Sequence, residues 1–260
     1  MERRRIDTLL TERGLAGSRT RAAAEVRAGR VRVGSGGRRV TRPGQLVAAD
    51  AELEIDPRAR YVSRGGLKLE QALDALGIEV DGRSCLDVGA STGGFTDCLL
   101  QRGAERVIAL DVGHGQLEWR LRNDPRVHVI ERKNARELTP ANLPYEPDLA
   151  TVDVSFISLA KVLPAVAVCL SGGGEILALV KPQFELGRGR AKGGVVRSAD
   201  ERREALVSVG EAVRALGLAI KGFASSGLAG PKGNRESFIW CATEGPGIEE
   251  LEAAARTVEP

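Results

Sequence analysis

The chain has 260 residues, of which 42% are hydrophobic and 28% are charged, and its formal net charge is +3. A disordered chain combines low hydrophobicity with high net charge, so this composition excludes wholesale disorder and allows one or two domains with a hydrophobic core. The charge is uneven, because residues 1–60 hold 14 arginines against 8 acidic residues, whereas residues 61–260 hold 24 basic against 27 acidic residues. We therefore expect a polyanion-binding module at the N-terminal end of the chain, joined to a module with another task.

Residues 1–57 predict a small α+β domain. Ile6, Leu9 and Leu10 follow helical spacing up to Gly14, and Ser18 is a suitable N-cap for a second helix that ends at Gly29. A strand is expected over residues 30–33, a turn over 34–37 and a further extended stretch over 47–55. Residues 58–64 then follow an Asp-Pro break and are expected to form an exposed linker.

Residues 65–260 predict alternating strands and helices. Strands are expected over residues 85–88, 107–111, 127–130, 149–154 and 176–180, with helices over 67–76, 94–102, 117–122, 159–170 and 199–216. This alternation indicates an α/β fold with a mostly parallel sheet that is covered on both faces. Residues 219–224 and 237–242 are expected to form an antiparallel edge, and residues 249–256 are helix-like.

The four cysteines form no CxxC pair and have no histidine cluster beside them: Cys85, Cys98, Cys169 and Cys241. This pattern predicts reduced thiols in a cytoplasmic protein and no metal site. The best candidate for a membrane segment is the apolar stretch over residues 157–170, which is interrupted by Lys161 and Pro164. It is too short to span a bilayer, because a spanning helix needs about 20 apolar residues, so we expect no membrane insertion.

A glycine-rich segment lies where the first strand of the second domain should meet a helix. Residues 89–93 match the G-x-S-x-G pattern of hydrolases, but the two histidines, His114 and His128, both come too early in the chain for such an enzyme. A nicotinamide-type G-x-G-x-x-G loop is disfavoured because position 91 is serine. A loop for S-adenosylmethionine fits better, since Asp87 precedes the first glycine and Asp111 ends the next strand, where an acid binds ribose hydroxyls. The cofactor-binding candidates are Asp87, Gly89, Ala90, Ser91, Thr92, Gly93, Gly94, Phe95, Asp111, Val112, Asn134 and Asp153.

Four charged residues stand in distinctive contexts: Lys68, Asp153, Lys181 and Glu236. Asp153 and Lys181 directly follow nearly pure apolar runs, so both should lie at the carboxyl edge of the sheet, where folds of this class bind ligands. A charge at the end of a buried strand is costly unless it is paired, and we therefore expect these residues to pair with one another. Lysine is scarce, with 7 in the chain against 31 arginines, and two of the seven belong to this group. Ordinary salt bridges at the rim of the sheet are the alternative.

These motifs together resemble the TlyA family of ribosomal RNA 2′-O-methyltransferases, some members of which are described as haemolysins. The resemblance covers residues 1–244 and is strongest at residues 62–66, 87–96, 121–127, 153–159 and 180–185. It implies an S4-type RNA-binding domain followed by a Rossmann-like class I methyltransferase domain of the FtsJ type. One departure is Tyr61, where members of the family can carry tryptophan.

The resemblance also implies the roles of the residues. Lys68, Asp153, Lys181 and Glu236 match a Lys-Asp-Lys-Glu catalytic tetrad for transfer of a methyl group from S-adenosyl-L-methionine to the 2′-hydroxyl of cytidine in 16S or 23S rRNA, or in both. The implied partners are ribosomal RNA and ribosomal subunits. Candidates for contact with the RNA phosphates are Arg3, Arg4, Arg5, Arg19, Arg21 and Arg30.

Two other classes of function stay open at this point. A non-catalytic ribosome-assembly factor could use a methyltransferase scaffold only to bind RNA, although the complete tetrad argues against it. A membrane-active haemolysin is disfavoured because no segment of the sequence is long and apolar enough to span a bilayer.

Overall fold

The computed structural model describes residues 2–259 except 35, 36, 58, 188 and 231, and the contacts within it divide the chain into two units, residues 1–59 and 60–260. Both helices of the N-terminal unit are confirmed: α1 spans Ile6–Glu12, and α2 spans Arg19–Arg27 with the Ser18 hydroxyl accepting a hydrogen bond from the N–H of Arg21. The strands β2 (Val31–Val33), β3 (Arg38–Val40) and β5 (Leu53–Ile55) form one antiparallel sheet in the order β3-β2-β5. A second pair joins β1 (Arg3–Arg5) to β4 (Leu46–Ala48).

One sequence prediction for this unit needs correction, and two of its strands were not predicted. The extended stretch over 47–55 is two strands in two different sheets, because a turn in which the N–H of Ala51 bonds to Ala48 O separates β4 from β5. The strands β1 and β3, which are rich in arginine, had no hydrophobic alternation to reveal them. The predicted turn at 34–37 contains residues 35 and 36, which lie outside the described residues.

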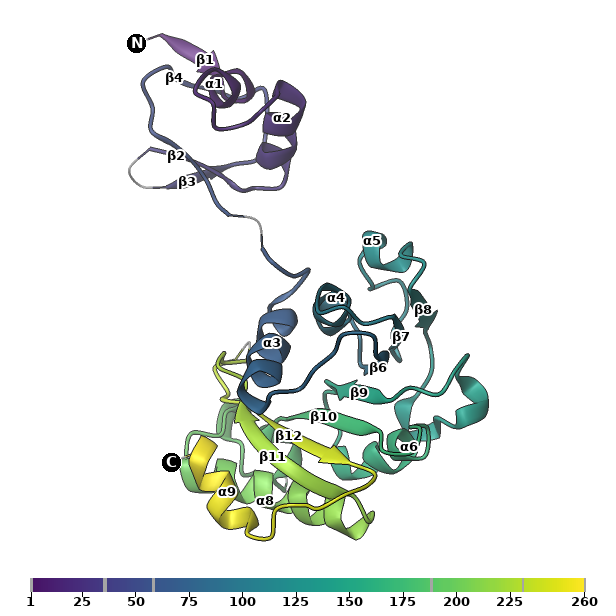
Figure 1. Ribbon diagram of the computed structural model, residues 1–260. Coiled ribbons are helices and arrows are strands. Elements are labelled where there is room, and N and C mark those ends of the chain that lie inside the picture. The colour runs from purple at the N-terminus through teal and green to yellow at the C-terminus, as the bar shows by residue number, and fades with distance from the viewer. Residues whose placement is uncertain (1, 35–36, 58, 188, 231, 260) are drawn as a thin grey trace. The chain divides into compact units, whose positions relative to one another are not determined.

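The second unit is built on a seven-stranded sheet in the order β11-β12-β10-β9-β6-β7-β8 (Figure 1). The five strands from β10 to β8 are parallel: β6 (Ser84–Val88), β7 (Arg106–Leu110), β8 (Val127–Ile130), β9 (Leu149–Val152) and β10 (Glu175–Val180). The last two, β11 (Ala219–Ser225) and β12 (Ser237–Ala242), are antiparallel. The predicted parallel sheet with an antiparallel edge is therefore confirmed.

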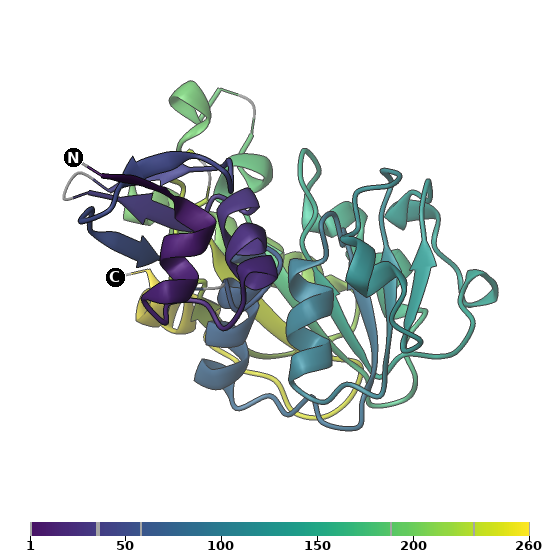
Figure 2. The same cartoon turned by 90° about the horizontal axis from the view of Figure 1, so that it is seen from above.

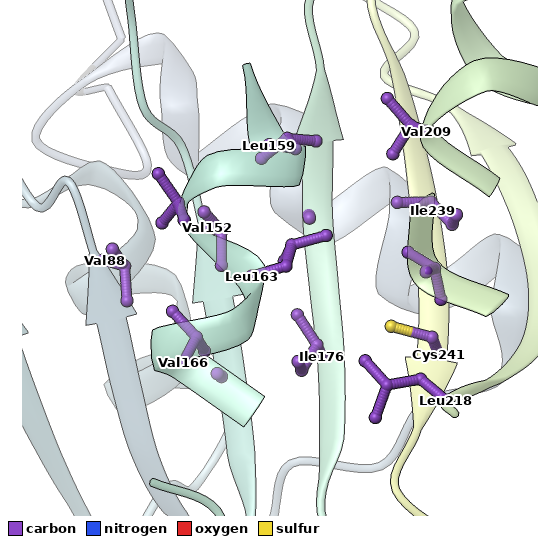
Figure 3. Close-up of a cluster of buried hydrophobic side chains, with 14 of the residues drawn as sticks. Val88, Val152, Leu159, Leu163, Val166, Ile176, Val209, Leu218, Ile239 and Cys241 are labelled. Carbon is purple, nitrogen blue, oxygen red and sulfur yellow. The ribbon is translucent and has the colours of Figure 1, made fainter. Parts of the chain in front are cut away.

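Helices cover both faces of this sheet. The helices α3 (Arg64–Leu76) and α4 (Gly94–Gln101) lie side by side on one face (Figure 2), packed on alternate strand residues such as Leu177 and Phe238. The other face carries α6 (Leu163–Ala167), α8 (Ala199–Ala215) and α9 (Leu251–Val258) over the apolar side chains in Figure 3, among them Ile176 and Ile239. Since neighbouring residues of a strand point to opposite faces, the near-continuous apolar runs of β9 and β10 fill both cores.

The helix predictions hold for the long elements and fail for the short ones. The expected helix over 159–170 is a 3₁₀ turn (Leu159–Lys161) followed by α6, because Pro164 has no N–H to continue an α-helix through this point. The expected helix over 117–122 is shortened to α5 (Trp119–Arg122). The short α7 (Pro182–Glu185) was not predicted, and α9 begins two residues later than expected.

The predicted linker is not exposed along its whole length. Tyr61 is only 2% exposed, and its hydroxyl donates a hydrogen bond of 3.0 Å to Glu70 Oε1 of α3. Gly66 makes this packing possible, because a Cβ at that position would lie 2.3 Å from the Tyr61 ring. Residue 58 of the predicted linker lies outside the described residues, and α3 begins at Arg64.

Candidate active site

The four charged residues singled out in the sequence form two ion pairs. Lys181 Nζ lies 2.5 Å from Asp153 Oδ1, an ion-pair distance, and donates a hydrogen bond of 2.9 Å to Ser155 Oγ. Lys68 Nζ pairs with Glu236 Oε2, and these two residues are 8% and 3% exposed. The pairing expected for Asp153 and Lys181 is thus confirmed. The Lys68–Glu236 pair was not predicted, and it joins residues 168 positions apart in the sequence.

The topology of the sheet brings these pairs to one edge. Asp153 and Lys181 directly follow the parallel strands β9 and β10, so both lie at the carboxyl edge. Glu236 precedes β12, whose first residue, Ser237, pairs with Val180 of β10, and Lys181 and Glu236 are therefore neighbours across two antiparallel strands. Lys68 comes from α3, which packs against the adjoining strand β11.

Asp87, a buried residue of β6, supports the glycine-rich loop between β6 and α4. This side chain is fully buried, and its Oδ2 accepts hydrogen bonds from the Thr96 N–H (2.8 Å) and hydroxyl (2.6 Å), while the Thr151 hydroxyl donates to Oδ1 at 3.3 Å. Burial raises the pKa of Asp87 to about 7, and the nearby charge of Asp153 contributes to this rise. Asp87 therefore shapes the loop from inside the protein.

Two glycines of this loop are required by close packing. Gly89 has a φ of +87°, and a Cβ there would lie 2.4 Å from the carbonyl oxygen of Asp153. Gly93 has a φ of +98°, and a Cβ there would lie 2.3 Å from Leu121 Cδ1. The loop is thus fitted on one side to the end of β9 and on the other to α5, and this brings the backbone of the loop up against Asp153.

Asp111 follows β7 and faces the same loop. Its carboxylate accepts the N–H of Ser91 at 2.8 Å and the N–H of Gly113 at 2.6 Å, and Val112 beside it is 72% exposed. A carboxylate next to an exposed apolar side chain suits the ribose hydroxyls and the flat base of a nucleoside. Ser91, exposed with a φ of +49°, directs its hydroxyl to Gln116 Oε1 at 3.4 Å, which is the wrong partner for a hydrolase nucleophile.

The remaining cofactor candidates differ in how accessible they are. Thr92 is exposed, whereas Ala90, Gly93 and Gly94 are buried in the loop. Phe95 is 3% exposed and packs on Phe238 with ring centroids 5.9 Å apart, so only its backbone is available to a ligand. Asn134 caps a short 3₁₀ turn, its Oδ1 accepting the N–H of Arg136 at 3.1 Å.

One prominent residue of the site had no role assigned from the sequence. Phe156 is 90% exposed with a φ of +66°, three positions after Asp153, and its ring lies 5.1 Å from that of Phe184. Glu185 anchors this loop, because its carboxylate accepts the Ser158 hydroxyl at 2.6 Å and the Leu159 N–H at 2.9 Å. Phe156 belongs to the motif at 153–159 that the sequence singled out, but only the structure shows that its ring is exposed to solvent.

The arginines expected to contact RNA lie in the N-terminal unit, and most of them reach solvent. Arg5 and Arg19 lie 2.8 and 3.4 Å from the buried carboxylate of Asp7, and Arg4 lies 2.7 Å from Glu12. Arg3 and Arg21 are exposed. Arg30 differs from them, because its Nε donates a 2.6 Å hydrogen bond to the buried Glu25 and its side chain is 27% exposed.

Comparison with known proteins agrees with this architecture. The sequence profile of the S4 domain matches residues 4–53, and that of the FtsJ-like methyltransferases matches residues 61–243. A Mycobacterium tuberculosis protein named 16S/23S rRNA (cytidine-2′-O)-methyltransferase TlyA is 49% identical over 93% of this chain and 91% of its own length.

Solved structures share the fold of this chain. A Streptococcus thermophilus protein described as a haemolysin superposes with a TM-score of 0.74 at 40% identity, covering 99% of this chain and 96% of that one. An S-adenosylmethionine-dependent methyltransferase from Listeria monocytogenes shares the fold of the second unit, with a TM-score of 0.52 at 14% identity over 70% of this chain and 98% of that one. The chain belongs to the TlyA family, and its second unit is a methyltransferase of the FtsJ-like type.

Proposed function

We propose that this enzyme transfers a methyl group from S-adenosyl-L-methionine to the 2′-hydroxyl of cytidine in ribosomal RNA, with Lys68, Asp153, Lys181 and Glu236 as its catalytic tetrad. The observation that carries the proposal is the meeting of the two ion pairs at the edge of the sheet, directly beside the glycine-rich loop. The relative from M. tuberculosis, which is named for this reaction on 16S and 23S rRNA, supports the choice of substrate. Because its substrate is ribosomal, we propose that the enzyme acts in the cytoplasm.

The residues present fit S-adenosylmethionine. Asp111 offers a carboxylate to the ribose hydroxyls, and the exposed Val112 offers an apolar surface to the adenine. The loop over residues 89–94, backed by Asp87, would hold the methionine portion next to Asp153, which supports a cofactor role for the Asp153 backbone as well. When bound, the cofactor supplies a methyl group on a sulfonium that needs no metal to activate it. The described residues contain no cluster of three or more side chains suited to a metal ion.

The tetrad orients the accepting hydroxyl and takes its proton. A ribose hydroxyl is a weak acid, so a neighbouring amine that accepts its hydrogen bond and then its proton makes the oxygen a better nucleophile. Lys181 is suited to this task in its uncharged form, because Asp153 and Ser155 hold its Nζ in place from the adjoining strand end. The proton that the amine takes from the hydroxyl then becomes part of the ammonium that pairs with Asp153. The Lys68–Glu236 pair, which is more deeply buried, fixes the other side of the site.

The rest of the enzyme presents the RNA to this site. The exposed arginines of the N-terminal unit would neutralise phosphates and hold the catalytic unit on its substrate, which supplies affinity without reading sequence. The exposed ring of Phe156 is placed to stack on the base of the target nucleotide once that base leaves its helix.

The test is transfer of a labelled methyl group to purified 30S and 50S subunits, followed by mapping of the modified ribose by mass spectrometry. We expect incorporation at a cytidine 2′-oxygen. Tight binding of S-adenosylmethionine without incorporation into either subunit would instead favour a ribosome-assembly factor on a methyltransferase scaffold.

A membrane-damaging activity has less support. Its basis is the word haemolysin in the description of the S. thermophilus relative, and no helix in the described part of this chain has the length and hydropathy to span a bilayer. Release of dye from lipid vesicles by the purified protein would overturn this ranking.

A further inference from the structure

Another buried ion pair lies outside the active site, on the opposite face of the sheet. Arg202 of α8 and Glu259, directly after α9, are 6% and 3% exposed, and Arg202 Nε lies 2.6 Å from Glu259 Oε2. The other oxygen of this carboxylate, Oε1, accepts a hydrogen bond of 3.2 Å from the hydroxyl of Ser237. Burying an ion pair is a poor way to gain stability, because desolvation of the two charges offsets most of their attraction. The pair therefore needs another explanation.

Ser237 connects this pair to the active site. It is the first residue of β12 and follows Glu236, and adjacent strand residues point to opposite faces of a sheet. The cores confirm this alternation, since Phe238 packs on the face that carries α3 whereas Ile239 packs on the face that carries α8 and α9. A hydrogen bond that holds Ser237 on the α8 side consequently turns Glu236 toward Lys68 on the α3 side.

The chain before Glu236 is fixed in a related way. Asn234 is 3% exposed, its Oδ1 accepts the N–H of Val196 at 2.9 Å, and its Nδ2 donates to the Gly194 carbonyl at 2.7 Å. Arg202 reaches the same segment, because its Nη1 donates to the Arg197 carbonyl at 2.7 Å. Side-chain hydrogen bonds thus hold the backbone on both sides of Glu236, and Arg202 contributes to both.

We infer that Arg202 and Glu259 are positioning residues for the methyl-transfer reaction, acting through the Ser237 hydroxyl to aim the Glu236 carboxylate at Lys68. This inference rests on the proposed function, in which the Lys68–Glu236 pair belongs to the catalytic tetrad. The competing explanation is that the pair only docks α9 on α8. The two explanations differ in what happens when α9 stays docked but the link to Ser237 is lost.

The decisive variant is Ser237→Ala, which removes the link and leaves the ion pair in place. We expect kcat for methyl transfer to ribosomal subunits to fall about tenfold, equivalent to about 1.4 kcal/mol in the barrier. The KM for the subunits and the Kd for S-adenosylmethionine should stay at their wild-type values. The midpoint of thermal unfolding should fall only slightly, because Arg202 still pairs with the Glu259 carboxylate. Ser237→Thr, which keeps a hydroxyl, should recover most of the lost kcat.

A double variant separates positioning from docking. Arg202→Met with Glu259→Leu replaces the buried pair by apolar side chains, which often preserves or raises stability. We expect a wild-type unfolding midpoint together with a kcat as low as that of Ser237→Ala. Thr257→Ala is the matched control, because its exposed hydroxyl donates to the Ala254 carbonyl within α9, and it should change neither quantity.

The outcomes are distinguishable. A wild-type kcat in Ser237→Ala, or in a folded double variant, would show that the pair serves only to dock α9. The wild-type enzyme is assayed first on the same subunits, and failure of the wild type to transfer any methyl group would overturn the proposed function and this inference with it. If the double variant does not fold, the kcat of Ser237→Ala still distinguishes positioning of Glu236 from docking of α9.

Discussion

In the N-terminal unit the arginines lie on the surface and pair with acids beside them, whereas in the second unit the pairs Lys68–Glu236 and Lys181–Asp153 lie at the buried edge of a sheet. The first arrangement leaves cations accessible to a polyanion, and it depends on salt. The second holds charges in fixed positions with little water around them, which strengthens their effect on a reacting group. The contrast fits the proposed function, in which the first unit docks the RNA and the second carries out the chemistry.

The pKa values of two buried aspartates, one in each unit, differ in the same way. The Arg5 and Arg19 guanidiniums beside Asp7 lower the pKa of that carboxyl to about 2, with the hydrogen bond from Arg5 as the largest cause. Asp87 has only hydroxyl and N–H donors around it, and burial raises its pKa to about 7. The contributions of Asp7 and Asp87 to stability therefore change with pH in opposite directions.

The largest effect should come from removing the amine of the catalytic unit. Lys181→Ala should reduce methyl transfer to ribosomal subunits by much more than tenfold, because a group that accepts the substrate proton contributes more than about 1.4 kcal/mol. Calorimetry should show near-normal binding of S-adenosylmethionine, and circular dichroism an intact fold. Lys161→Ala, at an exposed lysine, is the matched control. Activity above about a tenth of wild type in Lys181→Ala would remove Lys181 from its proposed role.

The next effect should come from the exposed ring beside the tetrad. Phe156→Ala should raise the KM for ribosomal subunits about tenfold, because stacking of a base on an aromatic side chain contributes about 1–3 kcal/mol. Stability should not change, since the ring is 90% exposed. Phe156→Trp keeps a stacking surface and should retain the wild-type KM. An alanine variant with unchanged KM would show that the ring takes no part in holding the substrate.

Phe156 also shows where sequence reasoning stops. Runs of apolar residues ending in Asp153 and Lys181 predicted both the parallel strands and the edge at which these charges meet, because strand direction follows from the alternation of elements. Which lysine pairs with which acid depends on the β10–β12 register and on the packing of α3, and neither is a local property of the chain. The orientation of Phe156 depends on its own left-handed backbone and on Glu185, which lies in a different segment beyond β10.

Elements without a hydrophobic period were missed for a related reason. The strand β1 consists of three arginines and is held by backbone bonds to β4, so its sequence favours a strand no more than a solvated tail. Tyr61 was expected in an exposed linker but is buried. Its ring fits because Gly66 has no side chain, and the sequence pattern does not reveal this contact. Long amphipathic helices such as α8 could be predicted, since their packing repeats along the chain.

A smaller effect is expected from the docking unit. Replacing Arg4 and Arg5 together with alanine should weaken binding to ribosomal RNA and make its salt dependence shallower, because fewer counterions are released from the phosphates. Binding should be measured at several salt concentrations, and kcat at saturating RNA should stay normal. The matched control is the double lysine variant, which keeps both charges and should bind nearly as the wild type does. An unchanged salt slope in the alanine variant would place the RNA contact elsewhere.

The last prediction concerns stability instead of activity and compares the two aspartates directly. Since folded Asp87 keeps its proton up to about pH 7, whereas an unfolded aspartate loses it near pH 4, the folded chain binds more protons between these values and its stability falls as pH rises through them. Asp87→Asn should remove this dependence. The free energy of urea unfolding of the variant, minus that of the wild type, should therefore increase from pH 4 to pH 7. Asp7→Asn is the counterpart: the stability supplied by Asp7 is complete above about pH 4 and is lost as pH falls toward 2, so that variant should differ from the wild type by a constant amount over the same range. A difference for Asp87→Asn that is equally constant would mean that Asp87 is already ionised in the folded protein, and the contrast between the two buried acids would not hold.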